Sequence, residues 1–96
     1  MPSYVFLVSW TAEGIKAVKK APERRDAFRK TVEDAGGKVL LHLHTMGAYD
    51  AVTAVELPSD EAANTLALRS GMQGFVRTTT LKGWPAAEFN ELIKKL

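Results

Sequence analysis

Hydrophobic residues alternate with polar ones in four segments of this chain and recur at helical spacing in three others. Alternation is typical of strands, and it predicts four of them. They are Ser3–Trp10, Lys38–Thr45, Ala51–Leu57 and Phe75–Lys82. The helical stripes are Ala27, Phe28, Thr31, Val32 and Ala35; Ala63, Leu66, Ala67 and Ser70; and Phe89, Leu92, Ile93 and Leu96.

Capping and stop residues delimit the predicted helices. Pro22, Pro58 and Pro85 stand where three helices begin, and Gly36-Gly37 and Gly71 stand where the first two end. Ser59 or Asp60 can cap the second helix, and Thr11 can cap a short helical turn after the first strand. The elements therefore follow the order β-α-β-β-α-β, with an additional C-terminal helix.

This order is typical of an α+β, ferredoxin-like domain that spans residues 1–96 as one unit. Right-handed crossovers predict an antiparallel sheet in the order 4-1-3-2, with both main helices on one face. The first strand is apolar on both sides, since Tyr4, Phe6 and Val8 alternate with Val5 and Leu7. The face without helices then needs a cover, so we expect a homodimer or a higher homo-oligomer.

The second strand has one face that is more apolar than the other. Val39, Leu41 and Leu43 form the first face, and His42 and His44 lie on the second. We expect the leucines to pack under the helices and the histidines to point to the opposite side of the sheet.

Composition and charge exclude several classes of function. Hydrophobic residues make up 46% of the 96 residues and charged ones 25%, as in a folded globular protein. Without cysteine there is no disulfide and no thiolate chemistry, and no apolar run reaches the length of a membrane span, about 18 residues. We therefore expect a cytoplasmic protein without membrane contact.

Seven basic residues lie between Lys16 and Lys30, although the net charge is only +2. A solvated helix face is our preferred interpretation, and a footprint for anions or nucleic acid is the alternative. RNA reading of the kind found on this topology needs aromatic residues on the third strand, and Ala51–Leu57 has none. Phosphate loops and serine-hydrolase elbows are also missing, so we predict no nucleic acid partner and no cofactor.

The candidate site surrounds the turn between the second and third strands. His42 and His44 project side by side, but without a third ligand they favour the wall of a semi-polar pocket over a metal site. Tyr49 and Asp50 are either turn-stabilising residues or, with a histidine, a proton-transfer pair. Arg77 interrupts the fourth strand and needs a carboxylate such as Asp50 or Glu56, an anionic ligand, or a salt bridge between subunits.

Gly47-Ala48-Tyr49-Asp50 resembles the signature of the GYD family, named for glycine, tyrosine and aspartate. The similarity extends over nearly the whole chain, including Tyr4-Val5-Phe6-Leu7 and Val76-Arg77-Thr78-Thr79-Thr80-Leu81. It implies the dimeric α/β-barrel superfamily, in which two sheets meet open face to open face. The same hairpin is also similar to the effector-binding domain of leucine-responsive regulators, which implies a ligand-binding oligomer.

These observations predict a small-molecule-binding protein that uses His42, His44, Tyr49, Asp50 and Arg77. One alternative is a cofactor-free isomerase, monooxygenase or decarboxylase that acts on a small carbonyl compound. The other is a structural or assembly protein.

Overall fold

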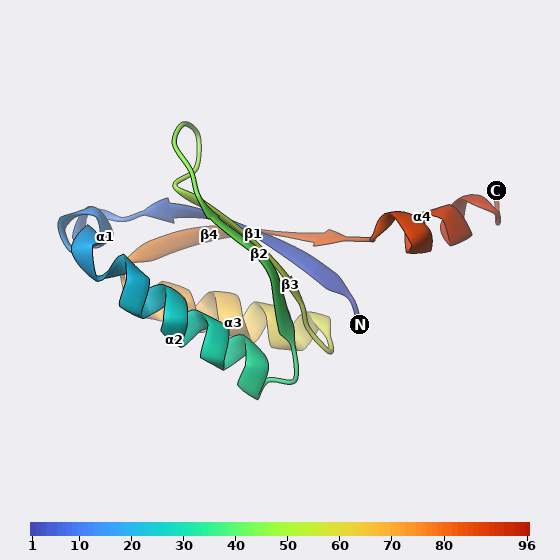
Figure 1. The fold of residues 1–96 in the computed structure, drawn as a ribbon, viewed down its shortest axis with the longest axis horizontal. Helices are drawn as coiled ribbons and strands as arrows, with labels where there is room; N and C mark the ends of the chain where they lie inside the picture. Colours follow the sequence, from blue (N-terminus) through green and yellow to red (C-terminus); the bar gives the residue numbers. More distant parts are fainter.

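A computed structural model describes residues 1–96 and shows a four-stranded antiparallel sheet (Figure 1). Its strands are β1 (Ser3–Trp10), β2 (Lys38–His44), β3 (Ala51–Glu56) and β4 (Val76–Gly83). They lie in the order β2-β3-β1-β4, which confirms the predicted order 4-1-3-2. The strand that is apolar on both faces, β1, pairs with β3 on one side and β4 on the other.

Two long helices cover one face of the sheet (Figure 1). These two helices are α2 (Ala21–Asp34) and α3 (Asp60–Met72). The chain also forms α1 (Ala12–Lys16), α4 (Ala86–Ile93) and a short 3-10 helix, η1 (Val18–Lys20), before α2. The predicted caps are present, because the Thr11 and Ser59 hydroxyls accept the backbone N–H groups of Gly14 and Ala62. Gly71 does not stop α3, which ends one residue later.

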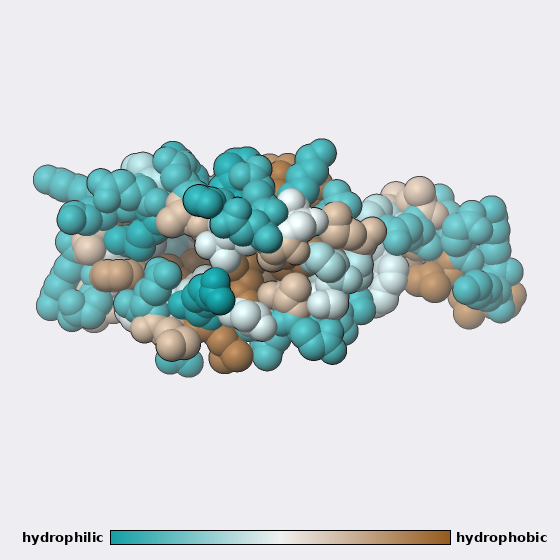
Figure 2. Space-filling model, turned by 90° about the horizontal axis from the view of Figure 1, so that it is seen from below, coloured by the Kyte–Doolittle hydropathy of each residue, from teal (hydrophilic) through white to brown (hydrophobic).

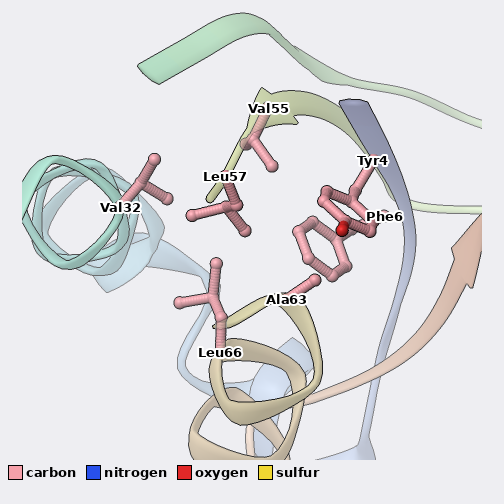
Figure 3. Close-up of a cluster of buried hydrophobic side chains, with 7 residues drawn as sticks. All are labelled: Tyr4, Phe6, Val32, Val55, Leu57, Ala63 and Leu66. Carbon is pink, nitrogen blue, oxygen red and sulfur yellow. The ribbon is translucent and has the colours of Figure 1, made fainter. Parts of the chain in front are cut away.

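The core lies between α2, α3 and the covered face of the sheet (Figure 3). Its buried side chains are Tyr4, Phe6, Val32, Val55, Leu57, Ala63 and Leu66. Phe28 of α2 meets Phe6 edge to face, with 6.1 Å between the ring centroids. Each main helix therefore joins the core through the apolar stripe that its sequence predicts.

A buried phenol ties the start of α3 to the sheet. The Tyr4 hydroxyl donates to Asp60 Oδ1 at 2.5 Å, and Lys82 Nζ lies 2.9 Å from the same oxygen. Burial first, and then this hydrogen bond, raise the pKa of Tyr4 to about 12. The Tyr4 hydrogen bond, and then the one from Lys82, lower the pKa of Asp60.

An irregularity in β2 reverses the predicted orientation of the histidines. Val39 pairs with Val55, but the next pair joins Leu41 to Ala54, so the register shifts at Leu40. The extra residue of a β-bulge moves every later side chain to the other face. His42 and His44 consequently lie opposite Thr53 and Ala51, which are buried under the helices.

The prediction that the histidines point away from the helices is thus wrong. Leu41 and Leu43 take that position instead, and they are 46% and 50% exposed. Together with Val5 and Leu7 of β1, Val52 of β3 and Leu81 of β4, they form what we call the open face.

The C-terminal helix stands apart from the rest of the domain. β4 leads into α4, which extends away from the sheet and the other helices (Figure 1). The stripe that contains Phe89, Leu92 and Ile93 is 41–52% exposed. No helix in the protein combines the length and the hydrophobicity that crossing a bilayer requires.

Candidate ligand-binding cleft

A cleft opens between the covered face of the sheet and the helices α2 and α3. It holds about 130 Å³, and its floor includes Phe6, Val8, Phe28, Ala51 and Leu66. Figure 2 views the helix-bearing side of the molecule, where hydrophobic atoms are visible in hollows between polar side chains. A dry engineered cavity of about 150 Å³ can hold a benzene ring, so this space suits a small organic group.

The two histidines of β2 form part of the cleft wall. His42 Nδ1 is 3.0 Å from the hydroxyl oxygen of Thr53, and the two imidazole rings lie 4.9 Å apart. Burial, and then electrostatic repulsion from His44, Arg25 and Arg29, lower the pKa of His42. The ring is therefore neutral near pH 7, with one nitrogen that donates and one that accepts a hydrogen bond.

His42 Nε2 is buried and has no hydrogen-bond partner. Leaving a buried donor or acceptor unsatisfied costs about 1–3 kcal/mol. His42 lines the cleft, so this unsatisfied nitrogen belongs to a side chain that borders the space for a bound molecule.

Aromatic rings gather at the end of the cleft where β1 finishes and β4 begins. The rings of Trp10 and His44 stack at 6.2 Å with an angle of 15° between their planes. The Arg24 guanidinium carbon lies 4.5 Å from the centre of the Phe75 ring and 5.9 Å from that of Trp10. These contacts hold the guanidinium beside two aromatic side chains through cation–π attraction.

The position of Phe75 depends on a close contact between α1 and the segment before β4. Thr11 donates its backbone N–H to the carbonyl of Phe75 at 3.1 Å and its hydroxyl to the carbonyl of Gly74 at 2.5 Å. At Gly14 only glycine fits, because any Cβ there would collide with the carbonyl oxygen of Phe75. The opening of the cleft is therefore built by residues far apart in the sequence.

The charged groups that line the cleft are all of one sign. Arg24, Arg25 and Arg69 belong to the lining, which contains no aspartate or glutamate. Arg24 and Arg69 form no salt bridge, and Arg25 has only its neighbour Asp26, at 3.7 Å. The cleft thus combines an apolar floor with cationic groups that carboxylates leave free.

Only two of the five predicted site residues meet in this cleft. His42 and His44 line it, whereas Tyr49, Asp50 and Arg77 do not. Arg77 is exposed and pairs with Ser9, so it shares the open face with Leu7 and Leu81. No group of three or more His, Cys, Asp or Glu side chains is arranged to hold a metal ion.

Asp50 is hydrogen-bonded to the backbone at the end of the β1–β3 pairing. Its Oδ2 accepts the backbone N–H of Trp10 at 2.8 Å, and its own N–H donates to the carbonyl of Val8 at 2.8 Å. Its carbonyl accepts the Thr45 N–H at 2.9 Å, while the Thr45 hydroxyl donates to the carbonyl of Tyr49. The Asp50 carboxylate therefore pairs with no histidine, and it fixes the backbone from which the Trp10 side chain projects.

Sequence reasoning misses the contributions of Trp10, Arg24 and Phe75 to the cleft. It places Arg24 on a solvated basic helix face. However, Arg24 lies four residues before Phe28 and seven before Thr31, so it continues the buried stripe of α2 by one turn. This spacing is the feature of the sequence that predicts the place of Arg24 beside the core.

Comparisons with known proteins agree with this architecture. Residues 4–93 match the GYD domain family. The chain is a member of the GYD domain family. This confirms the first resemblance drawn from the sequence; the likeness to leucine-responsive regulators stays a prediction.

This GYD domain protein is 30% identical over 95 residues to a protein of Thermus thermophilus. That relative is named glutamine synthetase and cystathionine beta-lyase binding protein, and the alignment covers 98% of our chain and 100% of the relative. A crystal structure of a protein from the same organism superposes with a TM-score of 0.55 at 20% identity. That superposition covers 90% of our chain and 96% of the other. It supports the fold.

Proposed function

We propose that this GYD domain protein binds a small organic molecule in the cleft between its sheet and its two main helices. The observation that carries the proposal is that His42, whose Nε2 is buried and has no hydrogen-bond partner, lines this apolar cleft. A ligand that bonds to this nitrogen would remove the cost of leaving it unsatisfied. The apolar floor would add a favourable contribution from burying hydrocarbon groups.

The cleft fits binding better than general-base catalysis. The one predicted carboxylate, Asp50, is engaged by the Trp10 N–H, and no other carboxylate lines the cleft. A histidine here lacks the acidic partner that commonly orients the ring and raises its basicity. The lowered pKa of His42 also makes its imidazole a weaker base.

The two tryptophans of the chain provide a test with an internal control. Trp10 lines the cleft, whereas Trp84 lies beyond it, between β4 and α4. In NMR spectra recorded against small organic compounds of different charge, binding should move the indole N–H signal of Trp10 and leave that of Trp84 in place. If no compound moves the Trp10 signal, the proposal is wrong.

Thr78→Phe and Thr80→Phe form a matched pair for the same experiment. Both residues lie on the covered side of β4, but only Thr78 lines the cleft. Filling the cleft at position 78 should abolish the response of Trp10, and the same change at position 80 should preserve it. Equal responses in the two variants would place the ligand elsewhere.

We also propose that the open face is covered by a second copy of the chain. Arg77 and Glu56 lie on this face at opposite ends of the sheet, beside Ser9 and Ser3 of β1 respectively. A twofold axis that runs across the strands would bring the Arg77 end of one copy over the Glu56 end of the other. The end that receives Arg77 also holds Lys38, the cross-strand neighbour of Glu56, so the apolar residues between the two ends are the main support for a homodimer, in which the same surface patch serves both subunits.

Binding of another protein is a second candidate function. The exposed apolar stripe of α4 supports it, as does the name of the Thermus relative, which describes a protein that binds two enzymes. Mixing the protein with a purified glutamine synthetase and following sedimentation tests it. Leu92→Asp should weaken the complex, and Lys95→Asp, at an exposed position just beyond α4, is the control.

A further inference from the structure

We propose that the ligand of the cleft is a small organic carboxylate with a compact apolar or aromatic body. This inference rests on the proposed function, and it concerns the chemical class of the ligand. The carboxylate would lie at the rim near Arg24, and the body would occupy the apolar floor.

The charge of the cleft lining favours an anionic ligand. Three arginines line the cleft without any acidic residue, and Arg24 and Arg69 have no carboxylate partner within the protein. Arg24 is partly buried, and a partly buried cation without a counter-charge favours an anionic partner, because attraction is stronger where water is partly excluded. A cationic ligand would be repelled by the same groups.

The geometry of Arg24 favours a carboxylate. Its guanidinium lies beside Phe75 and Trp10, and one of its nitrogens, Nη2, donates to the carbonyl of Ala17 at 3.3 Å. An arginine has five N–H donors in a planar fork, so most of them remain available. A planar fork that is already held in place suits two parallel hydrogen bonds to a carboxylate.

Burial within the cleft separates the two parts of the ligand. Phe6, Ala51 and Thr53 are buried at the floor, whereas Arg25, Arg69 and Gln73 are at the rim, where Arg25 keeps 39% of its side chain exposed. A charged group at the floor would lose its hydration, while one at the rim keeps part of it. The anionic end therefore belongs at the rim and the hydrocarbon end inside.

The size of the cleft limits the body of the ligand. A volume of about 130 Å³ has room for one six-membered ring or a branched aliphatic group. The neutral ring of His42 borders this space and offers a contact for a hydroxyl or carbonyl substituent.

Matched probes distinguish this inference from the proposed function. Benzoate, benzyl alcohol and benzylamine share one ring and carry a negative, a neutral and a positive group, and inorganic phosphate supplies an anion without a body. Titrations followed at the Trp10 indole signal should show benzoate binding at least about tenfold more tightly than the other three, as expected for a charge-assisted bidentate contact.

The possible results test the carboxylate inference and the proposed function separately. Comparable binding of benzyl alcohol or benzylamine would overturn the carboxylate inference but leave a ligand cleft in place. Inorganic phosphate binding as tightly as benzoate would also overturn it, since the apolar body would then contribute nothing. No response of Trp10 to any of the four would contradict the proposed function itself.

Arg24→Gln and Arg29→Gln form the matched pair of variants. Both arginines belong to α2, but Arg29 does not line the cleft. Arg24→Gln should weaken benzoate binding about tenfold or more, and Arg29→Gln should change it less than about threefold. Equal effects would reduce the interaction to general electrostatics and overturn the assignment to Arg24.

Arg24 also contributes packing, so a second variant guards against loss of folding. Arg24→Lys keeps the charge and the aliphatic stem but removes the planar fork. With the fold verified by circular dichroism, it should still weaken benzoate several-fold. Full affinity in Arg24→Lys would show that the fork is unnecessary and would contradict the bidentate contact.

Discussion

The two faces of the sheet are both apolar, yet they differ in what the chain does with them. The covered face supports the core, and at its less densely filled end it leaves a cleft lined by arginines and histidines. The open face presents Leu41, Leu43 and Leu81 with 46–50% of their surface exposed. Ionisable side chains thus line the covered face, where helices partly exclude water, whereas exposed leucines lie on the open face, where no helix lies.

This contrast teaches that the apolar content of a strand does not reveal its role. A covered face can combine burial with polar groups, so that burial shifts a pKa, as it does for His42. On the open face the charged residues Arg77 and Glu56 lie at the ends of the sheet, and covering the apolar residues between them chiefly gains hydrophobic free energy. Substitutions on the two faces and in the cleft test this difference.

Phe6→Ala should cause the largest loss, lowering the free energy of unfolding by about 3–5 kcal/mol, because it leaves a cavity in the core. The neighbouring Leu7 lies on the open face, so Leu7→Ala should lower the free energy of unfolding by less than half as much. Urea unfolding at two protein concentrations measures both and reveals any contribution from self-association. Equal losses at low concentration would contradict the difference between the faces.

Leu43→Asp should weaken self-association by about 2–4 kcal/mol, because it places a charge within the proposed apolar interface. Leu68→Asp is the control: this leucine is 60% exposed on α3, away from the open face. Sedimentation velocity over a range of concentrations gives the result. A parent protein that is already monomeric, or a Leu43→Asp variant that associates as well as the parent, would rule out the open face as the interface.

Asp50→Ala should reduce the free energy of unfolding by about 1.5–3 kcal/mol, because the Trp10 N–H loses a charged acceptor. Asp50→Asn keeps an oxygen acceptor and should cost less. Chemical denaturation measures both, and the Trp10 indole signal reports the state of the cleft. An Asp50→Ala variant as stable as the parent would argue against a structural role and make this residue a functional candidate again.

The pH dependence of stability should show the smallest effect. Burial lowers the pKa of His42 in the folded protein, so between the folded value and about 6.5 the unfolded chain binds more protons. Stability is therefore complete above pH about 6.5 and falls as the pH decreases through this window towards the folded pKa. Unfolding free energies measured between about pH 5 and pH 8 test the slope.

His42→Asn should remove most of that slope while offering an amide nitrogen or oxygen to Thr53. His44→Asn, at an exposed neighbour on the same strand, removes only a secondary cause of the shift and should reduce the slope less than His42→Asn does. Asp60 does not interfere, because its lowered pKa acts only below about pH 4. A slope that survives in the His42→Asn variant would assign the effect to another group.

The elements, their order and most of their ends follow from local patterns in the sequence. Thr11 and Ser59 act as the caps that their spacing predicts, and Gly36 adopts the positive φ of 85° that favours glycine at the end of α2. These features are local, because they depend on backbone preferences and on residues a few positions apart. The two apolar sides of β1 likewise predicted an uncovered face.

Which groups share a site depends on tertiary contacts. One extra residue at Leu40 exchanged Leu41 and His42 between the faces, and alternation alone cannot reveal such a shift. Trp10, Arg24 and Phe75 meet only after β1, α2 and the start of β4 have packed together, through contacts between residues far apart in the sequence. Periodicity reports which side of an element a residue occupies, whereas the neighbours it meets depend on strand register and helix packing.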